Sequence, residues 1–156
     1  MTATPIPRTL SLSIFGDLDI SIINELPPGR KKIITKIVAP FNRNKAYRFI
    51  QEKISQGRQA FVVCPLIEES DKLGVKSAKQ EYKKLTTNLF PELEIGIIHG
   101  RLKKDEKESV MQNFIDSKIN ILVATAVIEV GIDIPNATIM MIEGAERFGL
   151  SQLHQF

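Results

Sequence analysis

The sequence has one cysteine, no tryptophan and no uninterrupted apolar run long enough to cross a membrane. The single cysteine, Cys64, cannot form an internal disulfide framework, which excludes a disulfide-stabilised secreted domain and favours a reducing compartment. Glu129 and Asp133 interrupt the apolar stretch 121–134. The amino terminus is not predicted to be a signal peptide, because Arg8 splits its apolar part and no small-residue cleavage site follows. We therefore expect a cytoplasmic domain.

Two phosphate-binding fingerprints are also absent. No glycine is followed by lysine, which excludes a G-x-x-x-x-G-K-[ST] loop, and there is no G-x-G-x-x-G. The acidic run 105–108 opens a predicted helix, whereas a magnesium-binding acidic box should end a buried strand, so we interpret it as helix-start charge. His99 and His154 have no cysteines at metal-ligand spacing, and no zinc site is predicted. By itself the chain contains no nucleotide-hydrolysing centre.

A length of 156 residues suits one domain with a real core, and 43% hydrophobic and 25% charged residues are typical of a globular protein. The charge is uneven, with a net charge of +6 over residues 1–58 and −3 over residues 59–156. The basic residues of the first third are a candidate surface for a polyanion, and the alternative is a lysine-rich solvated face. They are Arg30, Lys31, Lys32, Lys36, Arg43, Lys45 and Arg48.

The hydrophobic pattern alternates between strands and helices after a break at Pro27-Pro28-Gly29. Such alternation predicts an α/β fold with a mostly parallel sheet and helices on both faces. Strands are predicted at 33–38, 60–64, 94–98, 119–125 and 138–143. Helices are predicted at about 42–56, 70–89 and 103–116, with another beginning at 150.

Side-chain spacing within these elements predicts which residues are buried. Asn42 or Asn44 should cap the first helix and Gly57 should close it, while Cys64 should be a core thiol. The helices at 70–89 and 103–116 each carry an apolar stripe at helical period. Those stripes are Ala78, Tyr82, Leu85 and Leu89 in one helix, and Val110, Met111, Phe114 and Ile115 in the other.

The stretch 121–135, ILVATAVIEVGIDIP, carries the strongest local signal. It predicts a buried strand that ends at Thr125, where open α/β sheets place their ligands. Gly131 can adopt a positive φ, and Glu129 and Asp133 add carboxylates that suit sugar hydroxyls. The alternative interpretation is an ordinary βα turn with a capping threonine and solvated carboxylates.

Five motifs occur in order along the chain: TATPIPRTL (2–10), FVVCPLIEES (61–70), IHGR (98–101), VATAVIEVGIDIPNA (123–137) and ERFGLSQLHQ (146–155). Together they resemble the second RecA-like motor lobe of superfamily 2 DNA helicases. Within that superfamily the chain is most similar to the RecG family of ATP-dependent helicases of branched DNA. The string FGDLDISIINELPPGRK (15–31) favours that family over the transcription-repair coupling factors. The resemblance implies a three-layer RecA-like domain of the P-loop NTPase type.

The resemblance also implies roles for individual residues. Thr125 corresponds to a motif V threonine that bonds a DNA phosphate, and Gly100 and Arg101 correspond to a loop that contacts the DNA backbone. Gly131 and Asp133 correspond to positions lining the ATP cleft near the ribose. Glu129 belongs to the same motif without an assigned role. The implied coupling residues are Thr2, Ala3 and Thr4 of motif III, with Gln152 and Gln155 at the start of motif VI.

On this comparison residues 1–28 are a motif III segment and linker from a preceding lobe, and residues 29–156 are the second lobe, truncated inside motif VI. The expected parent is a bacterial cytoplasmic enzyme that uses ATP and Mg²⁺ on replication forks and Holliday junctions, in recombination and repair. Its first lobe and its wedge domain would complete the site. We expect the chain alone to hydrolyse no ATP, because the Walker motifs and the motif VI arginines are missing.

Two alternatives remain open at the level of sequence. One is the equivalent lobe of a transcription-repair coupling translocase. The other is a stand-alone Rossmann-like module that binds a nucleotide, against which the missing glycine fingerprint counts. The residues that flank both ends in the parent gene would separate the three hypotheses.

Overall fold

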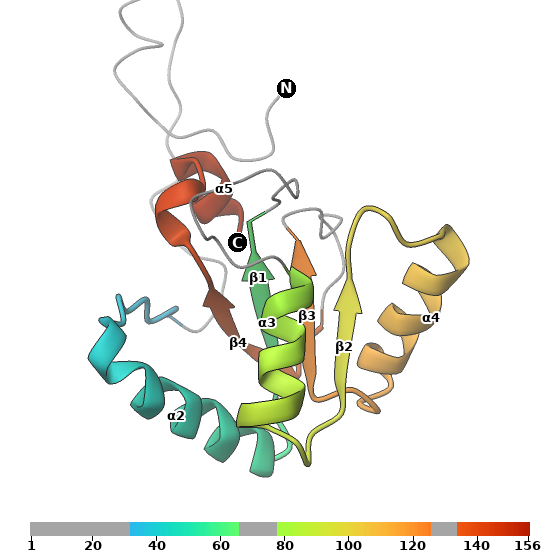
Figure 1. Cartoon of the computed structure of the whole chain (residues 1–156), viewed down its shortest axis with the longest axis horizontal. Helices are drawn as coiled ribbons and strands as arrows, with labels where there is room; N and C mark the ends of the chain where they lie inside the picture. The colour runs from blue at the N-terminus through green and yellow to red at the C-terminus, as the bar shows by residue number, and fades with distance from the viewer. Residues whose placement is uncertain (1–31, 66–77, 126–133) are drawn as a thin grey trace, which may run out of the picture.

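The structure, a computed structural model, describes residues 32–65, 78–125 and 134–156. Its centre is a four-stranded parallel sheet with the strand order β2-β3-β1-β4 (Figure 1). The strands are β1 (Gln59–Cys64), β2 (Ile95–Ile98), β3 (Ile121–Thr125) and β4 (Ala137–Ile142). The α-helices are α2 (Arg43–Ser55), α3 (Ala78–Lys84), α4 (Lys104–Ile115) and α5 (Leu150–Gln155). Shorter elements are the 3-10 turns η1 (Pro40–Asn42) and η3 (Ala145–Arg147), and a π-helical turn η2 (Leu85–Leu89) that continues α3.

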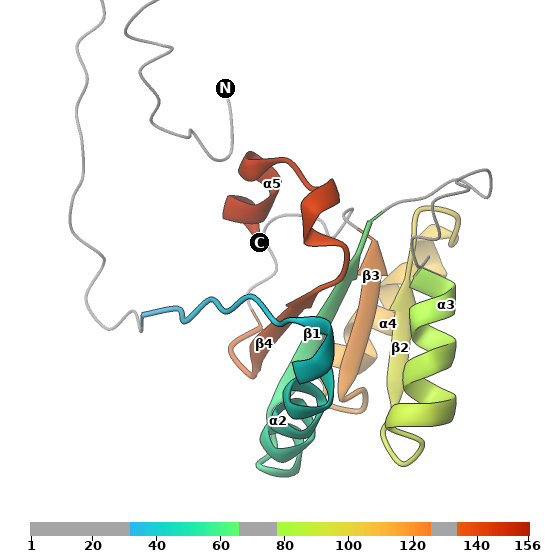
Figure 2. The ribbon, with the colours of Figure 1, turned by 60° about the vertical axis from the view of Figure 1, so that its left-hand side comes forward.

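Helices cover both faces of this sheet, as the sequence predicts (Figures 1 and 2). Alternate strand residues such as Val62 and Val123 pack with α2 and α3 in one core cluster. The intervening residue Leu122 packs on the other face with Phe114 of α4. Because side chains alternate along a strand, one apolar run supplies both cores. The three-layer α/β fold is confirmed.

The approach of α4 to the sheet depends on a glycine in β2. A methyl group added at Gly96 would lie 2.9 Å from Ile119 Cδ1 and 3.1 Å from Val110 Cγ1. With a larger residue at this position the Ile119 side chain would have to shift and Val110 of α4 would have to give by a few tenths of an ångström, so glycine allows the observed packing without any rearrangement. The small residue near the start of β2 therefore lets the side chains of α4 pack closely on this strand.

The predicted first strand is wrong. Residues 33–38 have no strand pairing, and their side chains are exposed, with 77% exposure at Ile33 and 102% at Ile37. A run of β-branched residues is compatible with a strand, but only a neighbouring strand can supply the ladder hydrogen bonds. The pattern alone therefore could not decide the structure of this segment.

Two details of the predicted helices also differ from the structure. Asn42 makes no side-chain capping bond, since the 3-10 turn η1 leads directly into α2. Ile115 is 46% exposed. At about 100° per residue, Ile115 points about 100° away from the buried Phe114, whereas Val110 lies about 40° from it. The stripe is therefore narrower than predicted at its carboxyl end.

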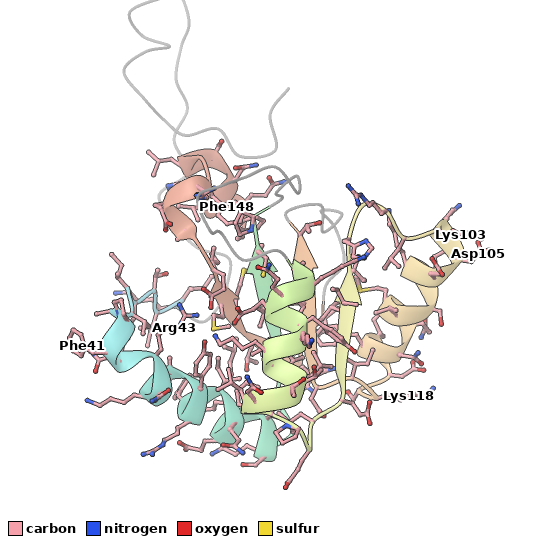
Figure 3. The ribbon with its side chains drawn as sticks, viewed as in Figure 1. Phe41, Arg43, Lys103, Asp105, Lys118 and Phe148 are labelled. Atoms are coloured by element: carbon pink, nitrogen blue, oxygen red, sulfur yellow. The ribbon has the colours of Figure 1, made fainter. Side chains whose placement is uncertain are left out.

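Other local predictions are confirmed. Gly57 has a φ of +81° and closes α2, with its N–H donating to the Ile54 carbonyl oxygen at 2.9 Å. At the start of α4, Glu106 accepts a hydrogen bond of 2.8 Å from the Lys103 N–H. Asp105 occupies the same first turn, at the position shown in Figure 3. The acidic run is therefore helix-start charge, as interpreted.

Two further findings concern the single cysteine and the lengths of the helices. Cys64 is fully buried in β1, which confirms it as a core thiol. Among the residues that the structure describes, no helix has the length and apolar character that a bilayer crossing requires.

Candidate nucleic-acid interface

The carboxyl ends of two neighbouring strands bring the predicted DNA-contacting residues to one edge of the sheet. Thr125 is the last residue of β3. In the neighbouring strand β1 it pairs with Cys64. On the other side, Ala124 of β3 pairs with Ile98, the last residue of β2. The chain leaves β2 directly into His99-Gly100-Arg101. Parallel topology therefore places Thr125 and the IHGR turn on adjacent strands.

The IHGR turn is open to solvent. The Leu102 N–H donates to the His99 carbonyl oxygen at 3.1 Å and closes the turn, while Gly100 and Arg101 are exposed. A Cβ atom built at Gly100 would meet no atom within 4 Å. The glycine is therefore not required by packing, and its exposed backbone leaves room for close approach of a ligand.

Thr125 is less accessible than the sequence suggests, because only 6% of it is exposed. Its position at the strand end is as predicted, but it is enclosed rather than displayed on a rim.

His99 adds a polar group at the same strand end, for which the sequence predicted neither a zinc site nor a DNA contact. Its Nδ1 atom is buried, and it has no hydrogen-bond partner among the described residues. Those residues also contain no group of three His, Cys, Asp or Glu side chains that could hold a metal ion. In the sequence, the feature that could have indicated His99 as a site residue is its place between the end of a predicted strand and Gly100.

A groove of about 920 Å³ lies along β2 and the first turns of α4. Three carboxylates (Glu94, Asp105 and Glu106) and one amine (Lys118) contribute to its lining, together with apolar side chains, so its charged groups are mainly acidic. Carboxylates repel the phosphates of a nucleic acid. The groove is therefore a poor candidate for the DNA-binding surface, which the IHGR turn suits better.

The second candidate region is α5, which carries two glutamines with a predicted coupling role. The side chain of Gln152 accepts a hydrogen bond of 3.0 Å from the Gly149 N–H and so caps the helix that contains it. Gln155 is exposed three residues later. The two residues that flank α5 also contact each other: Phe148 is buried and packs edge-on against Phe156, with ring centroids 5.3 Å apart.

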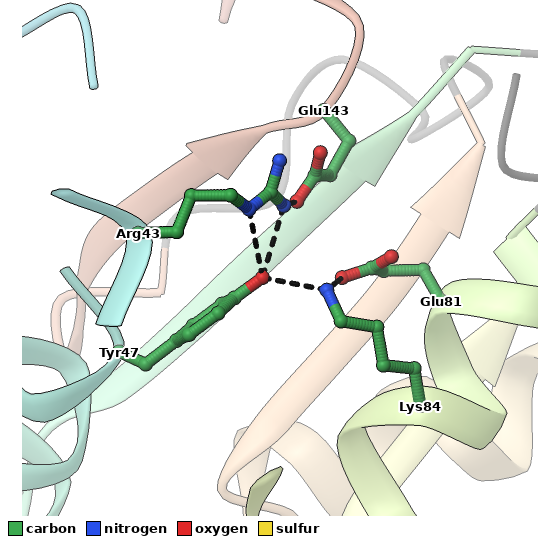
Figure 4. A network of polar contacts seen from close by, with 5 residues as sticks. All are labelled: Arg43, Tyr47, Glu81, Lys84 and Glu143. Carbon is green, nitrogen blue, oxygen red and sulfur yellow. Dashed lines mark hydrogen bonds and ion pairs between the residues drawn. The ribbon is translucent and has the colours of Figure 1, made fainter. Parts of the chain in front are cut away.

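A polar network joins α2, α3 and the end of β4 (Figure 4). The Arg43 guanidinium forms an ion pair with Glu143 and donates from Nε and Nη2 to the Tyr47 hydroxyl at 3.2 and 2.9 Å. Lys84 donates to the same hydroxyl at 2.7 Å and to Glu81 at 3.1 Å. One phenol oxygen is thus shared by two cations, each paired with a carboxylate.

This network changes the protonation equilibria of its cations. Partial burial acts to lower the pKa of Arg43, but the hydrogen bonds with Tyr47 and Glu143 and the charge of Glu143 outweigh it, so the pKa is raised. The pKa of Lys84 is raised in the same way, with burial opposed by its bonds to Tyr47 and Glu81. Both side chains therefore remain charged at neutral pH.

The candidate polyanion-facing surface needs one correction. Arg43 is half-buried and forms an ion pair with Glu143, so its charge is balanced within the domain and does not add to the basic surface. Lys32, Lys36, Lys45 and Arg48 are exposed. The sequence could not separate Arg43 from the others because its partner lies 100 residues away.

Six predicted site residues lie outside the described residues, so the structure gives no geometry for them. They are Thr2, Ala3, Thr4, Glu129, Gly131 and Asp133.

Comparison with known proteins identifies the family. The family model for the helicase conserved C-terminal domain matches residues 42–156. The chain belongs to this family. The match covers all the described helices and strands from α2 to α5, and so includes both candidate regions.

The relatives of this helicase C-terminal domain are much longer proteins. It is 54% identical over 99% of its length to the ATP-dependent DNA helicase RecG of Synechocystis sp., of which it spans 19%. It is 53% identical over 99% of its length to the RecG of Thermotoga maritima, of which it spans 20%. The chain thus spans about a fifth of the length of these curated relatives.

A solved structure of RecG bound to a three-way DNA junction matches 98% of the chain with a TM-score of 0.71 and 47% sequence identity. The chain corresponds to 20% of that protein. The sequence-based resemblance to the second lobe of RecG-type helicases is confirmed by these relatives and by this structure.

Proposed function

We propose that this chain is the second motor lobe of an ATP-dependent DNA helicase that acts on branched DNA in recombination and repair. The observation that carries the proposal is the match of 98% of the chain, at a TM-score of 0.71, to RecG bound to a three-way DNA junction. The identity of 54% to a protein named ATP-dependent DNA helicase RecG supports it. These relatives favour a RecG-type enzyme over the transcription-repair coupling translocase and the stand-alone nucleotide module.

In this proposal the lobe grips DNA through its phosphates. Phosphates are identical at every step along a strand, so a motor that holds them can translocate without reading bases. Arg101 would supply charge, Gly100 would allow close backbone approach, and Thr125 would donate a hydroxyl from the neighbouring strand. Their proximity at one sheet edge supports a shared contact with a single DNA strand.

ATP and Mg²⁺ enter the proposal through the similarity to ATP-dependent relatives. Gly131, Asp133 and Glu129 are the proposed cleft residues, and Thr2 to Thr4 with Gln152 and Gln155 are the proposed coupling residues. The first lobe and the wedge domain of the same parent would supply the remaining parts. We also propose that residues 1–28 belong to the linker between the lobes and that residues 29–156 form the second lobe in a bacterial cytoplasmic enzyme.

Two assays test the proposal. The complete protein should hydrolyse ATP faster with a three-way junction than with duplex DNA, whereas the 156-residue chain should show no ATPase with either. Fluorescence anisotropy of the chain should detect weak, sequence-independent DNA binding that falls with added salt. Thr125→Ala should weaken that binding by about 1 kcal/mol through one lost hydrogen bond.

Thr138→Ala is the matched control, since Thr138 is exposed on β4. It should leave DNA binding unchanged. Thermal melting of both variants separates a lost contact from lost folding, because Thr125 is buried. ATP hydrolysis by the complete protein that does not respond to DNA would overturn the proposed function.

A further inference from the structure

Glu143 occupies a junction between the sheet and the candidate coupling helix. It directly follows β4, and its backbone N–H donates to the Val63 carbonyl oxygen at 2.9 Å, which extends the pairing of β4 with β1. Its side chain is 10% exposed and forms an ion pair with Arg43. A buried carboxylate needs such a partner, because its desolvation is otherwise uncompensated.

Arg43 is itself held in place by Tyr47, one helical turn further along α2. Two guanidinium nitrogens of Arg43 lie 3.2 and 2.9 Å from the Tyr47 hydroxyl, and the guanidinium carbon lies 5.7 Å from the ring centroid. Tyr47 is only 7% exposed, and its hydroxyl also accepts from Lys84 of α3. The position of Glu143 is thus defined by two helices on one face of the sheet (Figure 4).

The chain turns sharply after Glu143. Gly144 takes the left-handed conformation with a φ of +59°, and its carbonyl oxygen accepts from the Arg147 N–H at 2.9 Å. The next buried anchor is Phe148, which packs edge-on against Phe156 beyond the end of α5. From Glu143 to Phe148 the chain connects the sheet to α5 through this short 3-10 turn, η3 (Ala145–Arg147).

We infer that Arg43 and Tyr47 are positioning residues that set the orientation of α5 through Glu143. This inference rests on the proposed function, in which Gln152 and Gln155 of α5 couple the ATP state to movement of the lobe. The ion pair and the shared phenol hold the end of β4 in one position, and α5 extends from there. Neither Arg43 nor Tyr47 touches DNA or ATP in this account, so their loss should lower turnover more than binding.

Charge reversal in the complete protein tests the inference. Arg43→Glu should lower the kcat of junction-stimulated ATP hydrolysis about ten-fold, with the KM for ATP and the Kd for the junction changed by less than about two-fold. The double variant Arg43→Glu with Glu143→Arg should recover kcat to within about three-fold, because the pair is restored with opposite polarity. Lys79→Glu on α3, at an exposed position, is the control and should keep kcat unchanged.

The outcomes distinguish the inference from the function on which it rests. If the unmodified protein shows no junction-stimulated ATPase, the proposed function fails. If stimulation is normal and Arg43→Glu keeps full kcat, or if the double variant recovers thermal stability without recovering kcat, the positioning role is wrong. If Arg43→Glu fails to fold, the kcat of Tyr47→Phe tests the positioning role instead, because this substitution keeps the ring and removes only the shared hydroxyl. Full kcat in folded Tyr47→Phe would then overturn the role of Tyr47.

Discussion

The side-chain amide of Gln59 donates a hydrogen bond of 2.6 Å to the backbone carbonyl oxygen of Phe114, 55 residues further along the chain. The same nitrogen donates to the Ile119 carbonyl oxygen at 2.7 Å, and the Gln59 oxygen accepts from Asn136 at 3.2 Å. Gln59 is 2% exposed. One buried amide thus joins the end of α4 to the segments that enter β3 and β4, at the sheet edge opposite the candidate site.

Gln59→Leu should lower the free energy of unfolding by about 3 kcal/mol, because it leaves the buried Phe114 carbonyl oxygen and the partly buried Ile119 carbonyl oxygen without their donor. Chemical denaturation followed by circular dichroism measures this. Gln51→Leu, at an exposed position on α2, is the control and should change stability by less than about 0.5 kcal/mol. Equal stability of the Gln59 and Gln51 variants would show that the buried amide contributes nothing.

Gly100→Ala should separate ligand approach from folding. A Cβ atom at Gly100 has open space around it, so stability should change by less than about 0.5 kcal/mol. DNA affinity should nevertheless fall by about 1 kcal/mol if a phosphate approaches this backbone.

Gly57→Ala should affect stability rather than DNA affinity, the reverse of Gly100→Ala. Gly57 has a φ of +81° and lies at the other end of the sheet. It should destabilise the fold by about 1 kcal/mol and leave the DNA affinity of the folded protein unchanged. Melting and anisotropy experiments on both variants test the pair. Unchanged DNA affinity in Gly100→Ala would remove this turn from the interface.

Arg101→Ala should reduce the slope of log affinity against log salt by about one unit without altering base preference, since one phosphate contact is lost. Arg58→Ala is the control, because Arg58 is exposed at the amino end of β1, away from the IHGR turn. Anisotropy titrations from low to moderate salt give both slopes. If the two variants behave alike, IHGR is only a strand-ending turn.

Lys84→Met should destabilise the domain by about 2 kcal/mol at neutral pH, because the amine bonds both Glu81 and Tyr47. The folded pKa of Lys84 is raised above its ordinary value of 10.5. Its contribution is therefore fully present below about pH 10 and is lost as the pH rises through the folded pKa. The stability difference between the two proteins should be constant from pH 7 to 9 and should shrink at higher pH. A difference that grows with pH would contradict this sign.

The sequence determined the fold class and most element positions by local patterning. The buried apolar run at 121–125, the stripe around Phe114 and the glycine at position 57 each specify their structure through nearby residues. The order of motifs determined the family for the same reason, since it depends on residue type and spacing alone.

Tertiary structure decided the features that depend on distant partners. Residues 33–38 have a strand pattern but no paired strand, and Thr125 has the predicted position but little exposure. The pairing of Arg43 with Glu143 crosses 100 residues. No local pattern encodes such a contact, because it exists only after parallel strands and covering helices bring the two side chains together. The sequence therefore placed Thr125 and the IHGR turn at strand ends, and packing decided which of the described side chains are accessible and which are held in contacts.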